Sequence, residues 1–120
     1  MIKLIASDMD GTLLNDDHMI SDENLKAIRK AQEMGRHFTI VTGRDYGAVK
    51  SYLEECNLKC ECILSNGAEY RDVNGNVIES VYMNKNSVKI VFDILNEAGL
   101  CIQLMTNNGS YITNKERQLN

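Results

Sequence analysis

The chain has 120 residues, of which 43% are hydrophobic and 25% are charged, and its formal net charge is −4. This composition is typical of a soluble globular protein, and the acidic balance leaves no basic surface for nucleic acid. No apolar run approaches the roughly 18 residues of a membrane span, and the first residues form no signal peptide, so we expect a cytoplasmic protein.

The four cysteines, Cys56, Cys60, Cys62 and Cys101, raise the question of a metal site or disulfides. Their spacing does not form the two Cys-x-x-Cys pairs that are typical of structural zinc sites. In a protein without a secretion signal, reduced cysteines that pack as small hydrophobic side chains are expected.

The most informative stretch lies near the amino terminus. Residues 2–6 form a short apolar run that predicts a strand buried in a sheet, and Asp8 and Asp10 follow it directly. In open α/β sheets, ligands bind just outside the carboxyl ends of the strands. Two carboxylates this close repel each other, so we expect a hard divalent cation, Mg²⁺ first, to offset them. The glycine that follows, Gly11, permits a loop whose amides can bind an anion.

Strand and helix alternate over the next part of the chain. Ser21 is a suitable cap for a helix that stops near Gly35, and His37–Val41 reads as the second strand. This order predicts two parallel strands joined by a right-handed crossover. Thr42 therefore falls at the same edge as the two carboxylates, where its hydroxyl and the Gly43 amide are candidates for binding phosphate oxygens.

A second helix is expected from a cap at Asp45 to about Cys56, and Glu61–Leu64 reads as the third strand. The following loop, residues 65–68, falls at the same edge of the sheet and is either a plain Asn-Gly turn or part of the substrate entrance. The role of Arg44 is also left undecided, because an arginine at the start of a helix is often only a solvated surface group.

The pattern changes after residue 68. An antiparallel hairpin, a helix capped by Ser87 and a second hairpin follow, which is an α+β signature. We place a domain boundary near Asn84. The expected elements are strands at residues 69–72 and 76–79, a helix at 87–98, and strands at 101–106 and 110–113.

The motif Asp8-Met9-Asp10-Gly11-Thr12-Leu13-Leu14 resembles the first motif of the haloacid dehalogenase-like superfamily. Thr42-Gly43-Arg44 is similar to its second motif, and the change of pattern after the third strand resembles the cap inserted in the Cof-like phosphatase branch. The resemblance implies an α/β fold, with a Rossmann-like parallel sheet core at residues 1–84 and the beginning of an α+β cap domain at residues 85–120. It also implies that the loop at residues 65–68 borders the substrate entrance.

The resemblance implies a Mg²⁺-dependent phosphatase that acts on small, sugar-phosphate-like metabolites. Asp8 would attack phosphorus to give an aspartyl-phosphate, and Asp10 would be the general acid and base. The Asp8 carboxylate and the Asp10 carbonyl would hold Mg²⁺. The hydroxyl of Thr42 and the amides of Met9 and Gly43 would hold the phosphoryl oxygens.

The resemblance extends over the whole chain but over only the first half or less of a Cof-like phosphatase. The family's later motifs, a lysine and an acidic cluster, have no convincing equivalent, since Lys115 falls in the expected cap. We therefore expect an amino-terminal piece with little activity alone. Its uncovered apolar faces favour self-association, marginal stability or a partner that supplies the missing carboxyl-terminal part.

Two other classes of protein fit part of the pattern. A receiver domain has about this length, but it requires its phosphoacceptor aspartate after the third strand, where this chain has Ser65. A non-catalytic phosphate-binding module or subunit, which needs a second chain, fits the absence of the later motifs.

Overall fold

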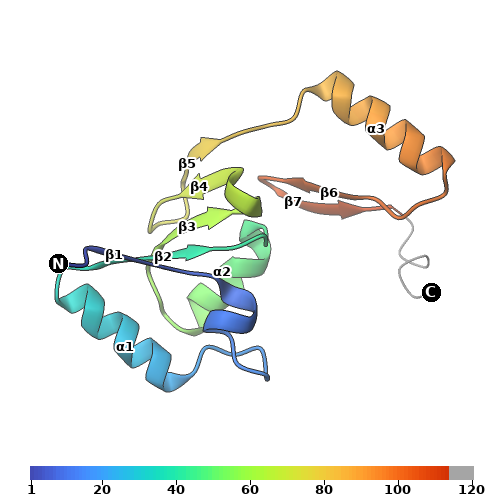
Figure 1. Cartoon of the computed structure of the whole chain (residues 1–120). Coiled ribbons are helices and arrows are strands. Elements are labelled where there is room, and N and C mark those ends of the chain that lie inside the picture. Colours follow the sequence, from blue (N-terminus) through green and yellow to red (C-terminus); the bar gives the residue numbers. More distant parts are fainter. Residues whose placement is uncertain (114–120) are drawn as a thin grey trace.

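The computed structural model describes residues 1–113 and contains two sheets, a larger one near the amino terminus and a two-stranded hairpin near the end of the described chain (Figure 1). Residues 114–120, which include Lys115 of the expected cap, lie outside the described part. Within residues 1–113, no helix is long and apolar enough to cross a bilayer.

The larger sheet has the strand order β1-β2-β3-β4-β5. Its first three strands are parallel, as predicted from the strand–helix alternation, and the last two are antiparallel. The strands are β1 (Leu4–Ser7), β2 (His37–Val41), β3 (Glu61–Leu64), β4 (Glu69–Arg71) and β5 (Val77–Ser80). Parallel pairing brings the carboxyl ends of the first three strands to one edge, so the residues that follow them become neighbours.

The crossover helices α1 (Asp22–Glu33) and α2 (Tyr46–Glu55) begin where the sequence predicted. The hydroxyl of Ser21 accepts a hydrogen bond from the amide of Asn24 at 3.2 Å, and the carboxylate of Asp45 accepts one from the amide of Ala48 at 2.9 Å. Each cap satisfies an amide that the helix itself leaves without a partner.

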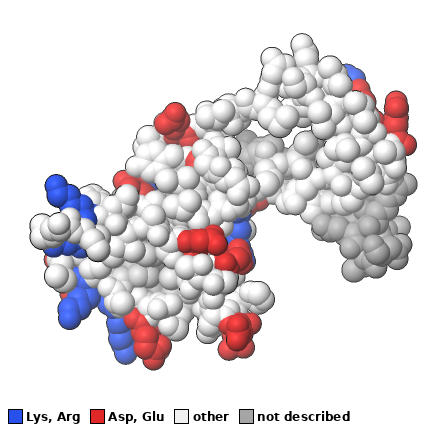
Figure 2. Space-filling view, in the orientation of Figure 1, with Lys and Arg blue, Asp and Glu red and all other residues white. Residues whose placement is uncertain are grey.

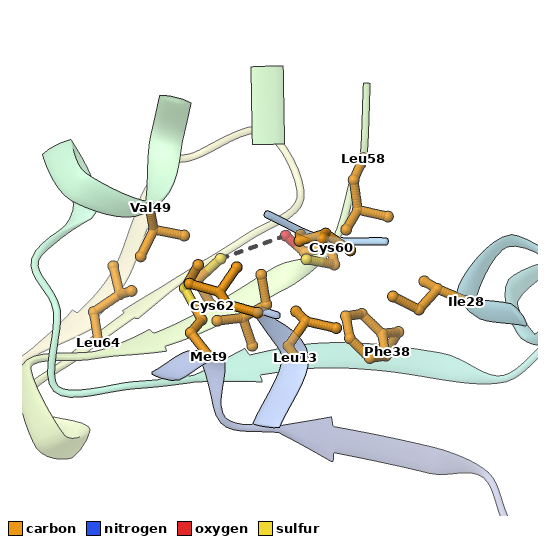
Figure 3. Packing of buried hydrophobic residues seen from close by; sticks show 12 residues of the cluster. Met9, Leu13, Ile28, Phe38, Val49, Leu58, Cys60, Cys62 and Leu64 are labelled. Carbon is orange, nitrogen blue, oxygen red and sulfur yellow. Dashed lines mark hydrogen bonds between the residues drawn. The ribbon is translucent and has the colours of Figure 1, made fainter. Parts of the chain in front are cut away.

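Both helices pack on the same face of the sheet, where the hydrophobic core lies. Figure 3 shows Ile28 of α1 and Val49 of α2 over Phe38, Cys62 and neighbouring side chains. The prediction for the cysteines is confirmed in part, because all four thiols are free and Cys60 and Cys62 are buried, whereas the other two are half-buried. The hydrogen bond with the neighbouring Cys62 thiol, together with burial, raises the pKa of Cys60, which favours its uncharged form in the core.

Strand β1 differs from the prediction. It begins at Leu4, two residues later than expected, and it is not buried: Leu4 is 55% and Ile5 38% exposed. The reason is its place at the end of the sheet, since β2 is its only pairing partner among the described residues. An apolar run thus predicted the strand but not its burial, which depends on neighbours distant in sequence.

The remaining elements follow a short linker. Helix α3 (Lys85–Glu97) precedes the hairpin of β6 (Gln103–Thr106) and β7 (Gly109–Ile112). The predicted cap Ser87 is wrong: Asn84 caps α3, and its side-chain oxygen accepts from the amide of Asn86 at 2.9 Å. An asparagine three residues upstream offered an equivalent acceptor, so the helix starts earlier. The proposed division at residue 84 stays a prediction.

Candidate active site

The carboxyl ends of β1, β2 and β3 border one pocket of about 580 Å³. Hairpin β6–β7 lies beside this edge of the sheet in Figure 1 and supplies part of the wall. The lining residues come from three loops, from the start of α2 and from β6: Asp8, Asp10, Thr42, Gly43, Arg44, Asp45, Ala48, Asn66, Gln103 and Met105.

The two carboxylates are presented by a wide single turn, η1 (Met9–Leu13). Met9 and Leu13 point into the core and anchor the turn, while Gly11, at φ 71°, lets the backbone reverse. The turn closes with a hydrogen bond from the Leu14 amide to the Met9 carbonyl at 2.9 Å. Because Met9 lies between Asp8 and Asp10 and is buried, both aspartates are left facing the pocket.

Asp10 forms an ion pair with Arg44. Nη2 of Arg44 donates to Oδ1 of Asp10 at 2.6 Å, and Nε donates to Oδ2 at 2.9 Å. The guanidinium also donates to the hydroxyl of Tyr52 at 3.4 Å and lies 5.4 Å from the centre of its ring. The hydrogen bonds from Arg44 hold the pKa of the Asp10 carboxyl below its usual value, and they raise the pKa of Arg44.

Thr42 and Gly43 are fixed by the loop that follows β3. The buried hydroxyl of Thr42 accepts from the amide of Arg44 at 3.2 Å, and the carbonyl of Thr42 accepts from the amide of Asn66 at 3.2 Å. A side chain at Gly43 would place its Cβ 3.0 Å from the Oδ1 of Asn66. The loop turn η2 (Ser65–Gly67) therefore packs directly on the Thr42 loop, and Asn66 borders the pocket.

Hairpin β6–β7 is attached to the sheet by polar contacts. The hydroxyl of Ser110 donates to the carboxylate of Asp45, which is also the cap of α2. The guanidinium of Arg71 donates to the carbonyl of Asn107, in the hairpin turn, at 3.1 Å. The Ser110 contact and the Ala48 amide lower the pKa of Asp45, so this carboxylate is held ionised. These contacts fix the hairpin beside the pocket.

The oxygen donors near Asp8 fit a magnesium ion. The Asp8 carboxylate faces the pocket and the Asp10 carbonyl belongs to the same turn, and both are hard oxygen donors. The Asp10 carboxylate is bound by Arg44, so the backbone carbonyl oxygen of Asp10 is the atom available to bind magnesium. Within residues 1–113, no group of three or more acidic, histidine or cysteine side chains clusters as a metal site. Magnesium commonly keeps several waters and binds through one or two carboxylates plus substrate phosphate, so two protein oxygens are compatible with it.

The structure thus brings Asp8, Asp10, Thr42 and Gly43 together around one pocket. Met9, predicted to bind phosphate through its amide, is fully buried and is not among the residues that line the pocket. Their chemical roles stay predictions. The residue that follows β3 is Ser65, so the carboxylate that a receiver domain needs there is absent at that position.

Four residues of the pocket, Asp45, Ala48, Gln103 and Met105, were not predicted from the sequence. Asp45 was expected only as a helix cap, although it also borders the pocket. Gln103 and Met105 lie about sixty residues from the Thr42 loop, and no local signal relates them to it. Their alternation along β6, which places them on one face of the strand, becomes informative only when the hairpin is known to lie beside the pocket.

Comparison with known proteins gives a consistent result. A family model described as haloacid dehalogenase-like hydrolase matches residues 5–120. The 5-amino-6-(5-phospho-D-ribitylamino)uracil phosphatase YcsE of Bacillus subtilis (strain 168) is 43% identical over 96 residues, covering 80% of this chain and 39% of YcsE. Phosphatase YwpJ of the same organism is 33% identical over 118 residues, covering 98% of this chain and 41% of YwpJ.

Comparison of the fold with solved structures points to the same family. The solved structure of a haloacid dehalogenase-like hydrolase from B. subtilis aligns with a TM-score of 0.91 at 33% identity, over 98% of this chain and 41% of that one. The chain therefore spans about two-fifths of the length of these relatives, and the match falls on their amino-terminal part, as predicted.

Proposed function

Because the chain belongs to the haloacid dehalogenase-like hydrolase family, whose model matches residues 5–120, we propose that it carries the nucleophile of a Mg²⁺-dependent phosphatase. The reaction is hydrolysis of phosphate monoesters of small metabolites. One observation supports the proposal most: Asp8, Asp10, Thr42 and Gly43 border a single pocket at the carboxyl edge of the parallel sheet.

The proposed chemistry has two steps. A carboxylate oxygen of Asp8 attacks phosphorus, forming an O–P bond as the bond to the ester oxygen breaks, and Asp10 gives its proton to the departing alcohol. Water then attacks the aspartyl-phosphate, Asp10 takes the proton of that water, and Asp8 and inorganic phosphate are released. Asp8 suits the first role because a carboxylate is already ionised at neutral pH.

The surrounding groups position the phosphoryl oxygens. The Thr42 hydroxyl and the amides of Gly43 and Met9 are the proposed donors, and they act through orientation and electrostatic stabilisation. The Asp8 carboxylate and the Asp10 carbonyl would hold magnesium, which would reduce the repulsion between nucleophile and phosphate.

The name of one relative suggests which ester to test first. YcsE is named a 5-amino-6-(5-phospho-D-ribitylamino)uracil phosphatase, and it is 43% identical over the matched residues. We propose a small phosphorylated metabolite of this kind, with a sugar-like chain that carries the phosphate, as the substrate class.

The test uses the protein that carries this chain at its natural full length. We expect it to release phosphate from this ester and from p-nitrophenyl phosphate, to lose activity with a chelator, and to regain it with added Mg²⁺. Asp8→Asn should lower kcat by about 10⁴-fold or more, because the replacement is a poor nucleophile. Asp16→Asn is the matched control, since Asp16 is an exposed aspartate outside the pocket. Wild-type turnover by Asp8→Asn would overturn the assignment.

Beryllofluoride binding separates the phosphatase from a non-catalytic module. A carboxylate that accepts a phosphoryl group should capture this mimic, and Asp8→Asn should abolish the capture. A protein that binds phosphate but shows neither capture nor turnover would be a module that lacks the proposed chemistry.

A further inference from the structure

The wall of the pocket opposite the phosphate-binding loops is made by strand β6. Gln103 and Met105 line it, and as residues i and i+2 of one strand they share a face. Their cross-strand partners in β7 are Ile112 and Ser110. Ser110 contacts Asp45 at the start of α2, so this face of the hairpin is the one turned toward the sheet.

The position of this wall is held at two independent points. Ser110, the cross-strand partner of Met105, is bonded to Asp45, and Arg71 donates to the carbonyl of Asn107 in the hairpin turn. Arg71 is itself fixed by a buried ion pair with Glu69 at 2.5 Å. The wall therefore stands at a defined place relative to Asp8 and Thr42.

Two of the three carboxylates that line the pocket, Asp10 and Asp45, are engaged by groups of the chain itself. Among the described residues that line it, Arg44 is the single cation, and its three guanidinium nitrogens donate to the Asp10 carboxylate and to the Tyr52 hydroxyl. Asp45 is bonded to Ser110 and to an amide of α2. Figure 2 shows acidic and basic side chains together on the surface of the larger sheet and its helices, on the side that faces the hairpin. The surface over the hairpin is almost entirely uncharged.

We propose that Gln103 and Met105 recognise the leaving group, and that this leaving group is an uncharged, hydrogen-bonding alcohol. This inference rests on the proposed function. The amide of Gln103 both donates and accepts hydrogen bonds, which suits hydroxyl or amide groups. The flexible thioether of Met105 packs against carbon chains or rings. A second phosphate on the leaving group would meet no free cation of this wall, and its desolvation would go uncompensated.

The experiment compares leaving groups on the full-length protein. The esters are ribitol 5-phosphate, which is neutral beyond the reacting phosphate, fructose 1,6-bisphosphate, which is anionic, and phosphocholine, which is cationic. p-Nitrophenyl phosphate is the reference, because its leaving group offers little for an amide to bind. We expect kcat/KM for ribitol 5-phosphate to exceed that of both charged esters by about tenfold or more.

Variants of Gln103 test the wall itself. Gln103→Leu should lower kcat/KM for ribitol 5-phosphate by about tenfold and change that for p-nitrophenyl phosphate by less than about twofold. Gln103→Lys should raise the kcat/KM for fructose 1,6-bisphosphate relative to that for ribitol 5-phosphate by about tenfold. Tyr111→Ala is the matched control, since Tyr111 pairs with Leu104 on the other face of the hairpin and is 61% exposed.

The outcomes are distinguishable. If the wild-type protein hydrolyses these esters but neither Gln103 variant changes the ratios, or if a charged ester is preferred, the inference is overturned and the phosphatase stands. If the wild-type protein hydrolyses none of them, both fail. Equal melting temperatures of the variants exclude a folding defect as the cause of a changed ratio.

Discussion

Arg44 binds both carboxylate oxygens of Asp10, at 2.6 and 2.9 Å, across 34 residues of sequence. The two residues follow neighbouring strands, β1 and β2, so the parallel sheet brings them together. The guanidinium also donates to the hydroxyl of Tyr52 in α2 and lies close to its ring. The pair orients Asp10 toward the pocket and favours its ionised form.

This pairing has a consequence for the proposed chemistry. An ionised Asp10 is ready to accept a proton from water, but it must carry a proton to protonate a leaving alcohol. The ion pair must therefore loosen before the first step, so that the Asp10 carboxylate can take up a proton. We expect Arg44 to act as a positioning residue for Asp10.

The first prediction concerns Arg44→Gln. Loss of two charge-assisted hydrogen bonds should lower kcat/KM of the full-length protein by about 10- to 100-fold. Arg44→Lys should be intermediate, because an ammonium cannot reproduce the bidentate geometry. Arg36→Gln, before the amino end of β2 and so at the opposite edge of the sheet, is the control. Unchanged kinetics of Arg44→Gln on several esters would contradict the role.

The second prediction concerns pH. The pKa of Asp10 is lowered in the folded protein from the ordinary value of 3.8, so the ion pair stabilises the fold fully above that value. This contribution is lost as the pH falls through the lowered pKa. The stability difference between wild type and Arg44→Gln, from urea unfolding, should therefore be constant near neutral pH and shrink as the pH falls below 3.8. A difference that grew on acidification would be inconsistent with the pair.

The third prediction concerns the contact between Gly43 and Asn66. Gly43→Ala should destabilise the protein by about 1–3 kcal/mol, because the added methyl group meets the Asn66 side chain. Asn66→Ala removes the obstructing amide, so the double variant should be more stable than the sum of the single effects predicts. Urea unfolding of the four proteins measures this coupling. Strict additivity would show that the backbone moves instead.

The fourth prediction concerns the buried ion pair of Glu69 and Arg71. Arg71 also lies 4.0 Å from the centre of the Tyr46 ring and donates to two carbonyls. Arg71→Met should destabilise the fold by about 3 kcal/mol, since it leaves a buried carboxylate without its partner. Adding Glu69→Gln should recover part of the loss. Thermal unfolding measures both, and equal stability of wild type and Arg71→Met would contradict the prediction.

Local chemistry along the chain determined a large part of the fold. The bounds of β2 and β3 and the caps Ser21 and Asp45 agree with the sequence-based predictions. The common edge of Asp8 and Thr42 was also predictable, because parallel strands joined by a crossover helix end on the same side. These features depend on near neighbours and on the handedness of the chain.

Tertiary structure alone decided the rest. The exposure of β1 depends on which strands stand beside it, and the partner of Arg44 depends on the pairing of β1 with β2. Gln103 and Met105 enter the site only because Arg71 and Asp45 hold the hairpin beside it. Each of these contacts joins segments far apart in sequence, and their energy is set by packing and burial, which no local pattern of residues encodes.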